Sequence, residues 1–174
     1  MNPRRALAPL AVLAVLPFTA CGADEPVQRV SLTLPLVADG GAEAPLRVSG
    51  NVQRGVRLGD ATLLALADEE IELYEPFEKR RMRFRAAPLR DVLGLAGIEP
   101  EARTLHAVAL NDYVVDIPLD VALADGVYLA VRDGAGAPLP VSSGGPLRIV
   151  FTDDAKGADV ENYWIWSLAT VRVK

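Results

Sequence analysis

The sequence predicts an α+β protein with a mixed or antiparallel, β-rich sheet. Strand patterns outnumber helix patterns, and the helices are too few and too irregularly placed for repeated β-α-β units. The chain has 174 residues, 51% hydrophobic and 24% charged, which is a globular composition with the length of one domain. Its net charge of −5 is opposite in sign to that of a nucleic-acid binder, so no nucleic-acid partner is expected.

The N-terminus has the features of an export signal. Two arginines precede residues 6–18, an apolar run that suits a signal peptide and is too short to span a bilayer. The segment from Phe18 to Cys21 resembles a bacterial lipobox, in which small residues precede a cysteine that becomes acylated; leucine is usual where Phe18 stands. We therefore expect a lipoprotein signal peptide at residues 1–20 and lipid attachment at Cys21. A secreted protein with an unpaired cysteine is the alternative.

This expectation sets the domain boundaries and the location. Residues 21–29 are polar and are predicted to form a tether, and residues 30–174 to form the domain. We expect the protein in the bacterial cell envelope, anchored by lipid and facing the periplasm, with the choice between inner and outer membrane left open. Its expected partners are membrane lipid, through acylated Cys21, and a membrane-protein or sensor partner.

Alternating apolar and polar residues mark the strands. Val30 to Leu36 is predicted to be an edge strand because it contains a proline. Thr104 to Leu110 is apolar on both faces apart from His106, as in a central strand. Asn111-Asp112 is expected to be a two-residue turn into residues 113–117. The other predicted strands lie near residues 46–52, 127–132, 139–141, 146–151 and 169–174.

Three short helices are predicted between the strands. They are residues 61–67, capped by Asp60; a helix that begins at Pro88 and is ended by Gly97; and a turn or short helix from Pro118 to Gly126. In the first, Leu63, Leu64 and Ala67 are expected on one face.

Between the first two helices, acidic residues precede basic ones in a pattern that predicts a β-hairpin with a loop at Pro76 to Lys79. This register gives an ionic face and an apolar face. The predicted pairs are Glu72 with Arg83, Glu70 with Arg85, Leu73 with Met82 and Ile71 with Phe84. The alternative is a row of arginines that binds an anion such as a phosphate.

Four later blocks resemble those of a known family. They are Ala109–Pro118, Val127–Arg132, Gly144–Val150 and Trp164–Val173. In this order and spacing, and with the helix at Pro88 to Gly97 before them, they resemble the oxidoreductase molybdopterin-binding domain family, especially its short single-domain bacterial members. The resemblance covers about residues 86–174 and implies the sulfite-oxidase-type fold, with molybdopterin as the cofactor of the catalytic members.

The catalytic members hold molybdenum through a cysteine thiolate in the first half of the domain. The only cysteine in this chain is Cys21, which is expected on the tether and cannot serve. A soft thiolate donor is therefore missing. Two hypotheses stay open: a molybdopterin-dependent oxidoreductase, and a cofactor-free module that binds a small ligand or a protein partner. The cofactor is therefore left unknown: molybdopterin is implied by the resemblance, and bound molybdenum is not expected.

The cofactor-binding candidates lie within the matched blocks and are Asn111, Asp112, Tyr113 and Arg148. The first three lie at a strand end, where rigid scaffolds place functional loops, although turn chemistry explains them too. Arg148 can face a phosphate, or Asp153 or Asp154. No catalytic residue and no metal ligand is assigned.

Three other features have a functional and a structural interpretation. His106 is either a ligand or a histidine satisfied within the hairpin. Ser142 to Gly145 offers small residues that could cradle an anion with backbone N–H groups. Trp164 and Trp166 are expected to pack in the core or at its rim.

Overall fold

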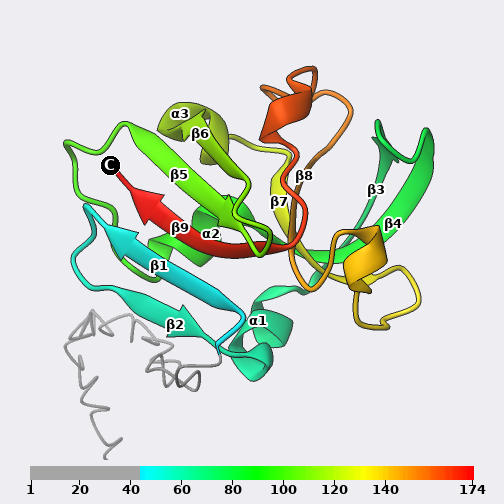
Figure 1. Ribbon diagram of the computed structural model, residues 1–174, viewed down its shortest axis with the longest axis horizontal. Coiled ribbons are helices and arrows are strands. Elements are labelled where there is room, and N and C mark those ends of the chain that lie inside the picture. Colours follow the sequence, from blue (N-terminus) through cyan, green and yellow to red (C-terminus); the bar gives the residue numbers. More distant parts are fainter. Residues whose placement is uncertain (1–43) are drawn as a thin grey trace, which may run out of the picture. The chain divides into compact units, whose positions relative to one another are not determined.

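The structure is a computed structural model that describes residues 44–174. Two β-sheets form the framework of this part of the chain (Figure 1). The first sheet has the strand order β2-β1-β9-β5-β6, and the second has the order β3-β4-β7-β8. Among the described strands only β1 and β9 pair in parallel, so the predicted mixed, strand-rich α+β class is confirmed. The predicted signal peptide, Cys21, the tether and the strand Val30 to Leu36 lie outside the described residues.

The strands agree with most of the predicted ones. The first sheet contains β1 (Leu46–Gly50), β2 (Val56–Leu58), β5 (Thr104–Ala109), β6 (Val114–Pro118) and β9 (Leu168–Val173). The second contains β3 (Glu69–Glu75), β4 (Arg80–Pro88), β7 (Val127–Asp133) and β8 (Arg148–Phe151). β5 is central, between β9 and β6, as its apolar sequence predicts.

The sequence did not predict β2, and two details of the predicted strands are wrong. Residues 139–141 form no strand; β7 pairs instead with β4 and β8, and Val141–Ser143 is a 3₁₀ turn, η1. Residues 110–113 connect β5 and β6, in place of the predicted two-residue turn; the amide of Ala109 donates to the carbonyl of Tyr113, and this hydrogen bond closes a three-residue loop, 110–112. Asp112 has φ 62° in this loop, the left-handed conformation that such loops require at their last position.

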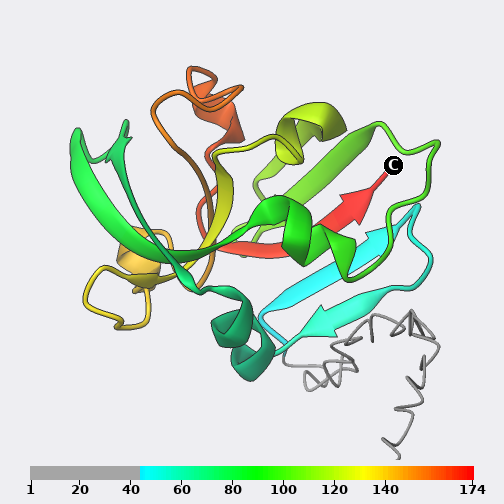
Figure 2. The ribbon, with the colours of Figure 1, turned by 180° about the vertical axis from the view of Figure 1, so that it is seen from behind.

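The helices are short, and all three fall where the sequence predicts them. They are α1 (Asp60–Leu66), α2 (Leu89–Gly94) and α3 (Leu119–Ala122), with a second 3₁₀ turn, η2, at Glu161–Tyr163. Gly59, not Asp60, is the N-cap of α1, and Leu64 is exposed because only Leu63 and Ala67 of its predicted face point inward. In Figure 1, α2 lies behind the first sheet, and in Figure 2, the view from behind, it lies in front of it; α2 contacts β4 and β7 of the second sheet.

The charged hairpin forms in the predicted register. β3 and β4 pair with Glu72 opposite Arg83, Glu70 opposite Arg85 and Ile71 opposite Phe84, around a loop at residues 76–79. Phe84 is fully buried, so the apolar face of the hairpin joins the core. Within residues 44–174 no helix is long and apolar enough to cross a membrane.

Candidate functional site

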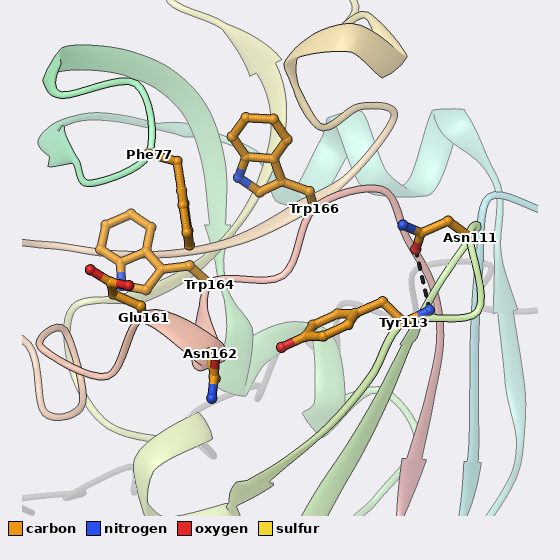
Figure 3. Close-up of a pocket in the computed structure, with 7 residues that line it drawn as sticks. All are labelled: Phe77, Asn111, Tyr113, Glu161, Asn162, Trp164 and Trp166. Atoms are coloured by element: carbon orange, nitrogen blue, oxygen red, sulfur yellow. Dashed lines mark hydrogen bonds between the residues drawn. The ribbon is translucent and has the colours of Figure 1, made fainter.

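A pocket of about 300 Å³ opens where three segments that are distant in sequence meet (Figure 3). This volume is at the lower end of the range of small-molecule sites. The hairpin loop after β3, the loop between β5 and β6, and the segment from η2 to β9 supply its lining. The lining residues are Phe77, Asn111, Tyr113, Glu161, Asn162, Trp164 and Trp166.

Aromatic rings make up most of the walls. Phe77 meets the indole of Trp166 edge to face, with ring centroids 5.9 Å apart. Trp164 is fixed from behind, since its ring packs on Phe151 and its Nε1–H donates to the carbonyl of Ala158 at 3.0 Å. Tyr113 reaches in from the β5–β6 loop, with its hydroxyl directed toward the side of the pocket that holds Asn162 (Figure 3).

Polar groups are few on this surface. Glu161 and Asn162 are exposed at the start of η2, and Asn111 accepts a hydrogen bond from the amide of Tyr113 at 3.2 Å. Glu161 makes no ion pair with any residue in the described range 44–174. The carboxylate is thus the one charge on the lining, beside two carboxamides and four aromatic rings.

Behind Trp166 lies a buried ion pair that the sequence did not predict. Arg148 and Glu75 are both fully buried, and Nη2 of Arg148 donates to Oε1 of Glu75. The guanidinium carbon of Arg148 lies 4.4 Å from the centre of the Trp166 ring. Burial lowers the pKa of Arg148 below its ordinary value, and the Glu75 carboxylate opposes this shift.

The predicted site residues divide between the pocket and its support. Asn111 and Tyr113 line the pocket, whereas Asp112 serves the turn and does not. Arg148 does not line the pocket, and its guanidinium pairs with the carboxylate of Glu75 rather than with Asp153 or Asp154. The sequence interpretation missed Phe77, Glu161 and Asn162 as pocket residues, and it assigned Trp164 and Trp166 to packing alone.

Acidic side chains pair with Arg80, Arg81 and Arg83 of the arginine row on β4. Glu72 accepts from Arg81 at 2.9 Å and from Arg83 at 2.7 Å, and these contacts lower the pKa of Glu72. Arg81 also pairs with Asp153, while Arg85 donates to a backbone carbonyl and not to Glu70. These contacts favour the structural interpretation of the row over the anion-binding alternative.

His106 and the segment 142–145, each of which had a functional and a structural interpretation, make hydrogen bonds within the protein. Nδ1 of His106 lies 2.5 Å from Asp116 on β6 and 2.9 Å from Nζ of Lys174, so the histidine is satisfied within its sheet. In the segment 142–145, the amides of Ser143, Gly144 and Gly145 all donate to carbonyls of the same loop. That segment therefore has no free amides in these positions to cradle an anion.

The residues of the site do not match a molybdenum centre. Within residues 44–174 no three His, Cys, Asp or Glu side chains come together in an arrangement that could hold a metal ion. No lysine or arginine lines the pocket, although a molybdopterin carries a phosphate that requires a cation or free amides. The aromatic walls fit the flat ring system of such a cofactor. The lining of the pocket offers no cation for its phosphate, and the described residues offer no ligand set for its metal.

The comparisons with known proteins agree with the fold. Residues 77–162 match the oxidoreductase molybdopterin binding domain. The structure is similar to the sulfane dehydrogenase SoxCD from Paracoccus pantotrophus, with a TM-score of 0.53 and 19% sequence identity over 74% of this chain and 37% of that chain. This chain thus matches little more than a third of that protein, and the likeness concerns the fold. No curated protein matches the sequence.

Proposed function

We propose that this chain, whose residues 77–162 are an oxidoreductase molybdopterin-binding domain of the sulfite-oxidase-type fold, is a binding module for a pterin-type heterocycle that does not hold molybdenum through a thiolate. The single observation that carries the proposal is the pocket itself: four aromatic rings, one carboxylate and two carboxamides, with no thiol and no cation on the lining. The family's cofactor contains a pterin, and this pocket suits that part of it.

The aromatic walls favour a flat, conjugated ligand. Offset and edge-to-face ring contacts contribute about 0.5–1.5 kcal/mol each beyond the burial of apolar area. Phe77, Tyr113 and Trp166 are all partly exposed and so have ring surface left to cover. A bicyclic pterin is small enough for a pocket of about 300 Å³.

The carboxylate gives the pocket a preference among flat ligands. The pyrimidine ring of a pterin presents two adjacent N–H donors, the 2-amino group and N3–H, which match the two oxygens of a carboxylate. Glu161 supplies such a carboxylate at the pocket edge, and Asn162 and Asn111 can pair with the remaining ring atoms. A hydrogen bond to a charged group contributes about 1.5–3 kcal/mol, and we expect the low end because Glu161 is exposed.

The proposed setting is the periplasmic face of a bacterial membrane, with acylated Cys21 as the anchor. In this setting a module without chemistry of its own would act by presenting its ligand to a membrane-protein or sensor partner. The family match supports a second candidate, an active molybdopterin-dependent oxidoreductase. That candidate needs a metal ligand other than a cysteine of the folded domain, because Cys21 is the only cysteine.

The experiment compares two pteridines that differ at one position. Titration calorimetry of the mature protein with pterin should give saturable binding, and lumazine, which carries a carbonyl in place of the 2-amino group, should bind about tenfold more weakly. Glu161→Gln should remove most of this preference. Asp159→Asn, an exposed carboxylate that does not line the pocket, should keep it. Absence of pterin binding, or equal binding of both compounds, would contradict the proposal.

A further inference from the structure

We infer that the buried pair of Glu75 and Arg148 is a positioning device that fixes the Trp166 and Phe77 walls of the ligand pocket. The inference rests on the proposed function, since it assigns residues to the same pocket. Neither residue lines the pocket, and both are fully buried behind it. They act through the aromatic residues that would touch the ligand.

The Glu75 carboxylate contacts both walls. Its Oε1 lies 3.3 Å from Nε1 of Trp166, which donates to it. Its Oε2 accepts from the amide of Glu78 at 2.5 Å, and that hydrogen bond closes the loop that carries Phe77. A single side chain at the end of β3 therefore sets the orientation of one indole and the conformation of the loop that bears the opposing ring.

Arg148 holds the same indole from its face. The guanidinium stacks on Trp166 at 4.4 Å and on Phe84 at 5.5 Å, while Nη1 donates to the carbonyl of Ser143. Its Nε has no hydrogen-bond partner among the described residues. A buried arginine with an unpaired nitrogen is not the arrangement that maximises stability, because well-packed apolar residues of similar volume often do as well.

The packing around the indole leaves it little freedom. A Cβ atom at Gly144, which has φ 79°, would lie 2.7 Å from Cγ of Trp166 and 3.0 Å from Cδ of Arg148. The ring is therefore confined by Gly144, by the guanidinium and by the carboxylate. A wall fixed before binding costs less side-chain entropy when the ligand arrives, and the affinity rises accordingly.

The test replaces the pair by apolar residues without leaving a lone charge. The variant Glu75→Leu with Arg148→Met should unfold cooperatively in urea and should bind pterin about tenfold more weakly than wild type. The control is Glu72→Leu with Arg83→Met, an ion pair on the outer face of the same hairpin, which should keep wild-type affinity. A pair that serves stability alone would shift the urea midpoint and leave the affinity for pterin unchanged, and that result would overturn the inference.

A cycle with Trp166→Phe shows whether the pair acts through the indole. Phenylalanine cannot donate to Glu75, so the loss of affinity caused by the pair replacement should largely disappear in this background, and strictly additive losses would overturn the inference. The near-ultraviolet circular dichroism of Trp166, taken as the difference from Trp166→Phe, needs no ligand and should collapse when the pair is replaced. An unchanged band would overturn the inference, whether or not pterin binds the wild-type protein. Absence of pterin binding to wild type would contradict the proposed function and is a separate result.

A conservative variant keeps the test open if the double replacement fails to fold. Arg148→Lys retains the charge that neutralises Glu75 and loses the flat guanidinium that stacks on Trp166. We expect weaker pterin binding and an altered Trp166 band with a cooperative unfolding transition. Wild-type affinity together with a wild-type band would overturn the inference.

Discussion

Replacement of Gly144 by alanine tests how tightly the indole of Trp166 is held. Gly144 adopts φ 79°, a conformation that costs an alanine about 1 kcal/mol. The added methyl group would also lie 2.7 Å from Cγ of Trp166, closer than Cβ atoms approach other side chains, and 3.0 Å from Cδ of Arg148, which is a tight contact. Neither side chain can move away easily, since Arg148 is fully buried and the indole of Trp166 donates a hydrogen bond to Glu75.

A second glycine separates the two contributions. Gly136 has φ 82°, nearly the same as Gly144, but a Cβ atom there would meet nothing within 4 Å. Gly136→Ala should therefore lower the free energy of unfolding by the conformational cost alone, about 1 kcal/mol. Gly144→Ala adds overpacking, which costs about 1–3 kcal/mol, for a total of about 2–4 kcal/mol.

Urea unfolding at 25 °C, followed by far-ultraviolet circular dichroism, measures both variants. Pterin titration of the same samples should show weaker binding to Gly144→Ala and unchanged binding to Gly136→Ala. Equal destabilisation by the two substitutions would mean that the indole moves freely away from position 144. Unchanged pterin affinity in Gly144→Ala would mean that the orientation of Trp166 does not matter to the ligand.

Three further predictions concern the anchor, the hairpin and acid stability. Cys21→Ser should move the protein from the membrane to the soluble periplasmic fraction, and a variant that still sediments with membranes would rule out acylation. Arg83→Glu should lower the urea midpoint and added Glu72→Arg should partly restore it; additive losses would mean that the two side chains do not meet. The pKa values of Glu72 and Asp153 are lowered, the first by hydrogen bonds from Arg83 and Arg81, the second by the amide of Tyr74 and then by Arg81. The two carboxylates therefore stabilise the fold fully above their unfolded-state pKa values of 4.5 and 3.8, and this stabilisation is lost as the pH falls through their lower folded-state pKa values. The urea midpoint should decrease over that pH range. A urea midpoint that does not change with pH there would contradict the pairing.

The hairpin of β3 and β4 was predictable because its signal is local. Alternating polarity fixed the faces, and the sign change from acidic to basic residues fixed the register. Glu75 shares its parity with the buried Ile71 and Leu73. Because alternate residues of a strand point to the same side of the sheet, this position indicated that the Glu75 carboxylate points into the core. Its partner Arg148, within a strand of apolar residues, was the matching signal.

The pocket was not predictable in the same way because its walls come from three separate segments. Phe77 follows β3, Tyr113 precedes β6, and Trp166 precedes β9, and only the pairing of both sheets brings them together. Asn111 and Tyr113 were singled out through the resemblance to a family, not through geometry. The spacing of Trp164 and Trp166, with buried Ile165 between them, was the one local sign that two indoles share a face.

The composition of the natively purified protein tests the central claim most directly. Protein isolated from the organism that produces it would be denatured. Its released pterin would be measured by fluorescence after oxidation, and its molybdenum by mass spectrometry on the same sample. We expect close to one pterin per chain and no stoichiometric molybdenum. About one molybdenum atom per chain would contradict this and would restore the family's redox chemistry to this pocket.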